Sequence, residues 1–83
     1  MNVHGYEVPD AVIQAALAAM VGEFTASKIE DAAISAGAPK TVKTSWAIES
    51  CASRIADRLL QRERSAGRIT FASKAWSVVQ RTT

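Results

Sequence analysis

The positions of three glycines constrain this chain more than any other feature of its 83 residues. Gly22, Gly37 and Gly67 each follow a stretch in which apolar residues recur every three or four positions, as on the buried face of a helix. After Gly67 the period changes to two, because Ile69 and Phe71 alternate with polar residues in the way typical of a strand. The chain therefore predicts three helices followed by a short β segment.

The residues at the helix ends set the expected boundaries. The first helix begins at Pro9, since proline suits the first helical position, and ends at the first glycine. The second begins near Thr25, a good N-cap, although Ser27 with Glu30 offers an alternative capping box. Residues 45–66 contain neither glycine nor proline, and their apolar spacing predicts one long third helix.

A hairpin completes the predicted fold, with strands around residues 69–71 and 76–79 and a loop at 72–75. A chain of this length forms one domain, so we expect a single unit over residues 1–83. Residues 1–8 precede the first helical pattern, and we expect them to form a flexible tail. The predicted fold class is mainly α with a small β-hairpin.

Several residues carry a family resemblance: Gly22-Glu23-Phe24-Thr25, Ile29, the run 56–64, the turn 65–69 and the returning strand 76–79. Over residues 9–80 they resemble the winged helix-turn-helix family, in particular its small stand-alone members from bacteria and phages. The resemblance implies three helices plus a C-terminal wing. Thirty residues separate Gly37 from Gly67, which is longer than the family pattern. Either residues 38–44 form a longer loop or the third helix is extended, so its start between Thr44 and Ser53 stays open.

The resemblance also implies a function in binding double-stranded DNA, as a small transcriptional regulator or an accessory factor in a DNA transaction. The third helix would enter the major groove and the wing would contact the flanking backbone. Arginine can bond guanine bidentately, and serine can bond a phosphate or a base edge. The expected DNA-binding residues are Ser50, Ser53, Arg54 and Arg58 on the helix, Lys40 and Lys43 before it, and Arg68 and Lys74 on the wing.

The charge distribution is compatible with a polyanionic partner. Residues 1–39 carry one base and five acids, for a net charge of −4, whereas residues 40–83 carry nine bases and three acids, for +6. An ordinary solvated surface accounts for these charges equally well. In that case Glu49, Asp57 and Glu63 would pair with the interleaved arginines.

The sequence does not predict an enzyme, a metal site or a cofactor. His4 is the one histidine and Cys51 the one cysteine, which is too few ligands for a zinc site and no basis for a nucleophilic dyad. Cys51 lies on the apolar side of the third helical pattern, where we expect a small core residue. Glu30 and Asp31 are adjacent, so on a helix their carboxylates diverge.

A protein–protein interaction module, such as a phage-type inhibitor or adaptor, is the alternative function. Val42, Trp46 and Ile48 could form an exposed apolar patch in that case, although tryptophans are more often core or interface residues. A homodimer through the alanine-rich first helix also stays open. The N-terminus lacks the basic and apolar regions of a secretory signal, and no apolar run is long enough to cross a bilayer, so we expect a cytoplasmic protein without membrane contact.

Overall fold

The computed structural model describes residues 1–72 and 75–78, and within them it contains three helices and seven short strands. The helices are α1 (Asp10–Ala18), α2 (Ala26–Ser35) and α3 (Ala52–Ser65). The strands are β1 (Asn2–Val3), β2 (Tyr6–Glu7), β3 (Glu23–Phe24), β4 (Thr41–Lys43), β5 (Ile48–Ser50), β6 (Ile69–Ala72) and β7 (Ala75–Val78).

The prediction of a mainly α fold with three helices and a single C-terminal wing is wrong. The strands form three antiparallel sheets, β1–β2, β4–β5 and β3–β7–β6, so the fold is α+β. The predicted hairpin after Gly67 is present as β6–β7, but β7 also pairs with β3 on its other side. Residues 1–8, expected to form a tail, contain the β1–β2 pair and place Val3 and Val8 in the core.

The first two helices begin where the sequence predicts. Pro9 precedes α1 with extended backbone angles, and the side chain of Thr25 accepts a hydrogen bond from the Lys28 N–H at 3.2 Å. The α2 helix is followed by Gly37, whose φ of +113° is one that side chains other than glycine rarely adopt. The capping role of Thr25 and the stop at Gly37 are therefore confirmed.

The third helix begins late within the range from Thr44 to Ser53 that the sequence leaves open, because the residues before it form a hairpin. The helix begins at Ala52, and β4 and β5 occupy most of residues 41–50. Between them the Thr44 hydroxyl oxygen accepts hydrogen bonds from the N–H groups of Trp46 and Ala47, at 3.2 and 3.1 Å. A threonine that bonds the following backbone in this way competes with helix formation, so the turn forms instead.

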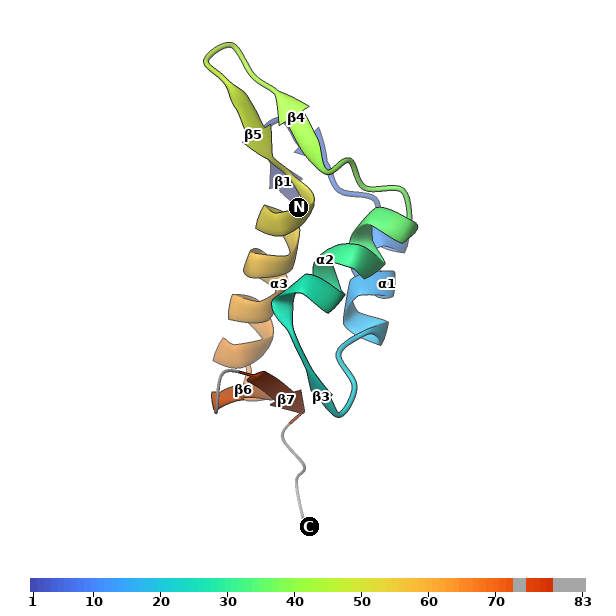
Figure 1. Cartoon of the computed structure of the whole chain (residues 1–83), viewed down its shortest axis with the longest axis vertical. Helices are drawn as coiled ribbons and strands as arrows, with labels where there is room; N and C mark the ends of the chain where they lie inside the picture. Colours follow the sequence, from blue (N-terminus) through green and yellow to red (C-terminus); the bar gives the residue numbers. More distant parts are fainter. Residues whose placement is uncertain (73–74, 79–83) are drawn as a thin grey trace.

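The core lies between the three helices, with Ile29, Ile55 and Leu59 among its fully buried side chains. The α3 helix packs against α2 and α1. Figure 1 shows the β4–β5 hairpin beyond the N-terminus of α3 and the β6–β7 hairpin beyond its C-terminus. The molecule is elongated, with extents of 48, 24 and 19 Å. The two hairpins therefore lie at opposite ends of α3.

Candidate nucleic-acid interface

The exposed side of α3 carries a row of arginines. Arg54, Arg58 and Arg62 recur every four residues and are exposed, while the intervening Ile55 and Leu59 are buried. Residues four apart lie on the same side of a helix, so burying one side of α3 presents the arginines together on the other. Arg64 is also exposed, in the last turn of the helix.

Glu63 does not neutralise this row. It is only 6% exposed, and its Oε2 accepts a hydrogen bond from Nη1 of Arg68. The Arg68 backbone N–H also donates to the Glu63 carbonyl at 3.0 Å, which holds the chain as it turns from α3 into β6. Arg68, predicted to hold phosphate from the wing, is thus engaged within the protein. Asp57 is then the one exposed carboxylate on α3, whose residues are all described.

The arginines of α3 form no ion pair among residues 1–72 and 75–78, where the two ion pairs are Met1 with Glu7 and Arg68 with Glu63. Arg58 donates a hydrogen bond from Nη1 to the carbonyl oxygen of Asn2, so the N-terminal hairpin positions its guanidinium. A neutral carbonyl leaves the positive charge of Arg58 uncompensated. The helix face is therefore cationic.

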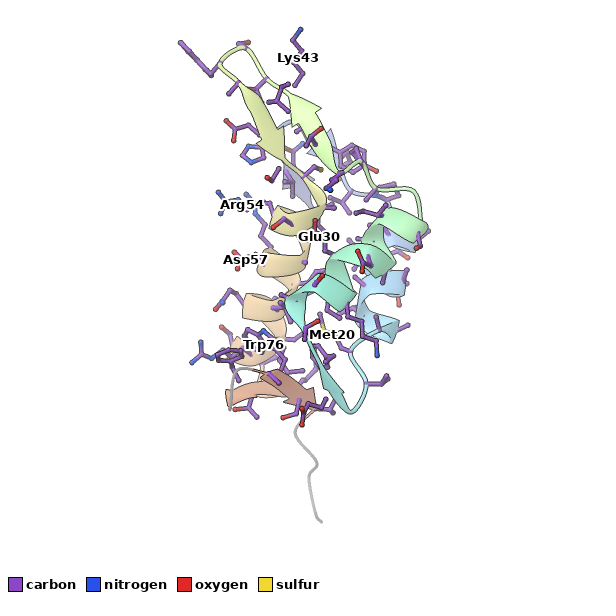
Figure 2. All side chains as sticks on the ribbon, viewed as in Figure 1. Met20, Glu30, Lys43, Arg54, Asp57 and Trp76 are labelled. Atoms are coloured by element: carbon purple, nitrogen blue, oxygen red, sulfur yellow. The ribbon has the colours of Figure 1, made fainter. Side chains whose placement is uncertain are left out.

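Three of the predicted site residues come together at the start of α3. Ser50, Ser53 and Arg54 line an open depression of about 370 Å³. Its other lining residues are His4, Glu49 and Asp57. Figure 2 shows Arg54 and Asp57 projecting from the same edge of α3. The depression is thus polar but of mixed charge, and it adjoins the cationic face rather than forming an anion pocket.

His4 at this depression is a residue that sequence reasoning missed. It lies in the turn between β1 and β2, with a positive φ of 50°, and is followed by Gly5 with φ of 85°. Only the Gly5 signal for a tight turn could have suggested that this segment is ordered.

The two predicted lysines lie at the β4–β5 hairpin. Lys40 precedes β4, Lys43 ends it, and both side chains are exposed. Figure 2 shows Lys43 projecting near the tip of β4–β5, well beyond Arg54. Lys74, the remaining predicted contact, lies outside the described residues. Of the eight predicted residues, six therefore lie on α3 or on the hairpin that precedes it.

No family model, curated protein or solved structure matches this chain. Its function must therefore be inferred from the geometry of the cationic face and its neighbours.

An apolar groove adjoins the cationic face on the side of the C-terminal sheet. It has a volume of about 360 Å³ and is lined by Leu60, Phe71 and Trp76, with Glu30 and Asp57 at its polar margin. The rings of Phe71 and Trp76 are tilted against each other with centroids 4.9 Å apart. Trp76 is only 9% exposed, so the contact between the two rings mainly stabilises the packing of β6–β7 against the core.

The described residues place the one cysteine in the core and form no metal-binding cluster. Cys51 is fully buried, and burial raises the pKa of its thiol, because the thiolate would lose its solvation. No cluster of three or more histidine, cysteine or acidic residues in the described part of the chain could hold a metal ion. None of the three helices is long and apolar enough to span a bilayer.

Proposed function

We propose that this chain is a non-enzymatic protein that binds double-stranded DNA, as a small transcriptional regulator or an accessory factor in a DNA transaction. The observation that carries the proposal is the exposed face of α3. Four arginines lie on this face with a single exposed carboxylate, and none of the four has an ion-pair partner in the described residues. They are Arg54, Arg58, Arg62 and Arg64.

The dimensions of α3 suit the major groove. Its 14 residues correspond to a length of about 21 Å, and the groove is about 12 Å wide, which admits one helix. The opposite side of α3 is buried against α1 and α2, so only the arginine face can enter. Arg54 lies in the first turn, near Ser50 and Ser53, where an end-on approach would bring all three close to the DNA.

Asp57 gives this face a means of discrimination. A carboxylate repels phosphate but accepts a hydrogen bond from the amino group of cytosine. A face with several arginines and one aspartate therefore favours particular base edges over the bare backbone. This composition supports specific recognition more than general adhesion to polyanions.

The proposal is tested by binding to random-sequence duplex DNA, measured by fluorescence anisotropy across a salt series. We expect log K to fall linearly with log salt, with a slope of about −0.9 for each phosphate contact. Arg54→Gln should weaken binding and make the slope shallower by about 0.9. The matched control is Lys28→Gln, which removes one exposed positive charge from the start of α2.

Absence of binding at low salt would refute the proposal. An equal loss in the Arg54 and Lys28 variants would also refute the assignment to α3, because net charge alone would then explain the affinity.

A protein–protein interaction module is the second candidate, favoured by two exposed apolar side chains. Trp46 and Ile48 on the β4–β5 hairpin are 93% and 71% exposed, which is unusual for side chains of this size. This function predicts a chain that is silent toward DNA at low salt and that loses one defined protein partner on substitution of Trp46 by alanine.

A further inference from the structure

We infer that the β4–β5 hairpin is a second DNA-contacting element, which inserts Trp46 into the minor groove beside the major groove that α3 occupies. The inference rests on the proposed DNA-binding function and extends it to a segment outside the helix. It assigns Trp46 an apolar contact with sugars and bases, and Lys40 and Lys43 contacts with phosphates.

The exposure of Trp46 is the first observation. The chain has two tryptophans, and Trp76 packs into the core while Trp46 is 93% exposed at the hairpin tip. Ile48, one residue after the turn, is also exposed. Neither side chain contributes to the buried core, so their positions are not explained by folding.

The turn that carries Trp46 is well defined. The Thr44 N–H donates to the Ala47 carbonyl at 2.8 Å, and the Thr44 hydroxyl donates to the same oxygen at 3.0 Å. The hydroxyl oxygen also accepts from the backbone of Trp46. A side chain on a braced turn loses less conformational entropy on binding than one on a loose loop.

The pairing register places Lys43 and Ile48 on one face of the hairpin. Lys43 pairs with Ile48, and Thr41 pairs with Ser50, while Val42 pairs with Glu49 between them. Because side chains alternate across a strand, the first two pairs share a face and the Val42 pair lies on the other. Val42 packs against the core, so the face with Lys43 and Ile48 is turned away from it.

The charges on this hairpin favour DNA over a protein as the occupant. Lys40 and Lys43 have no ion-pair partner within residues 1–72 and 75–78. Glu49, the one acid of the hairpin, lies on the face opposite to Lys43 and Ile48, where it lines the mixed-charge depression beside Arg54. Lys43 beside the apolar tip, with Lys40 at the base of the hairpin, matches a groove in which phosphates border a less polar floor of sugars and bases.

The position of the hairpin allows simultaneous contact with α3. The strand β5 runs into α3 through Cys51, and Figure 1 shows the hairpin continuing past the N-terminus of the helix. A helix in the major groove therefore places this hairpin at the neighbouring backbone and minor groove, where apolar side chains can wedge between base steps.

The test uses the full chain and a short duplex, with Trp46→Ala and Lys40→Gln/Lys43→Gln as variants. Removing the indole should lower affinity about tenfold without changing the salt slope, because stacking releases no counterions. Removing both lysines should make the slope shallower by about 1.8. Val21→Ala is the control, since it truncates an exposed apolar side chain between α1 and β3.

Intrinsic fluorescence supplies a readout on the unaltered protein. Trp46 is exposed and Trp76 is buried, so acrylamide should quench mainly Trp46 in the unbound chain. We expect DNA to protect Trp46 from acrylamide, and circular dichroism to show the same helix content in all variants.

The outcomes separate this inference from the function on which it rests. If Arg54→Gln weakens DNA binding while Trp46→Ala does not and acrylamide quenching is unchanged by DNA, the hairpin inference is overturned and the function stands. If the wild-type chain shows no salt-dependent binding, both are overturned. A Trp46 variant that keeps its DNA affinity but loses a protein partner also overturns the hairpin inference.

Discussion

Arg54, in the first turn of α3, and Arg68, just after its last turn, differ in environment. Exchanging each for glutamine should have opposite consequences. Arg54 is exposed and forms no ion pair among the described residues, whereas Arg68 binds the buried carboxylate of Glu63. Both substitutions remove one positive charge. We expect Arg54→Gln to affect DNA binding and not stability, and Arg68→Gln to affect stability and not the salt dependence of DNA binding.

The magnitudes follow from the structure. Six exposed cationic side chains on the hairpin and α3 lack an ion-pair partner in residues 1–72 and 75–78: Lys40, Lys43, Arg54, Arg58, Arg62 and Arg64. If all contact phosphate, the salt slope is about −5.4, and affinity falls about 10³-fold between 50 and 200 mM salt. Arg54→Gln should then give a slope of about −4.5, while Arg68→Gln leaves it near −5.4.

The effect of Arg68→Gln on stability depends on the burial of Glu63. That side chain is 8% exposed, whereas the side chain of Arg68 is 67% exposed. Leaving a buried carboxylate without its partner costs several kcal/mol in a closed core, but solvent near Arg68 lowers the cost to about 1–2 kcal/mol. For a domain of this size the melting temperature should fall by about 4–16 °C.

Thermal unfolding followed by circular dichroism measures the stability change, and anisotropy across the salt series measures the slope. The reasoning is refuted if Arg68→Gln reduces the slope as much as Arg54→Gln while melting at the wild-type temperature. That result would mean that Arg68 contacts DNA and that its bond to Glu63 contributes nothing to the fold.

Three further predictions concern the fold. Leu59→Ala removes a fully buried side chain and should lower the free energy of unfolding by about 2–5 kcal/mol in urea titrations, whereas the exposed Trp46→Ala should change it by less than about 0.5 kcal/mol. Thr25→Ala removes the cap of α2 and should cost about 1 kcal/mol in the same titrations, an effect that Thr25→Ser should largely restore. Burial raises the pKa of the Cys51 thiol, so the folded chain keeps a proton that the unfolded chain releases above about pH 9. Stability should therefore decrease at more alkaline pH, and iodoacetamide should react with Cys51 far faster in urea than in native buffer.

Local signals in the sequence were sufficient for part of this fold. The cap at Thr25, the stop at Gly37 and the change of period after Gly67 each depend on residues within a few positions of the boundary. Such signals act within a single helix end or turn, so they can be identified without knowledge of the tertiary structure.

The β4–β5 hairpin could not be predicted in the same way. Its turn has no Asn-Gly or Asp-Gly signal and depends on the Thr44 hydroxyl, and its ends are held by the bond from the Cys51 N–H to the Lys40 carbonyl. That bond joins residues eleven positions apart, beyond the reach of a periodicity argument. The N-terminal hairpin was missed for a related reason, since burial of Val3 depends on the assembled helices.

The candidate site also combines features that the sequence predicts with features that it does not. The exposure of Arg54 and Arg58 follows from the helical period, which predicted them correctly on the solvent side of α3. Glu63 lies on the buried side of the same helix, and its partner Arg68 follows the turn after α3. A pattern of apolar and polar letters cannot show that such a carboxylate turns inward to meet an arginine from the next element.

The base of the β4–β5 hairpin closes on itself, since the Ala52 N–H donates to the Pro39 carbonyl at 3.1 Å and the Cys51 N–H donates to that of Lys40. The two ends of the segment that connects α2 to α3 are thus held side by side. A segment with adjoining ends can be lengthened, shortened or exchanged at a small entropic cost, because the closure does not depend on what lies beyond it. The tip of the hairpin could therefore be exchanged for a different sequence while α2 and α3 keep their packing.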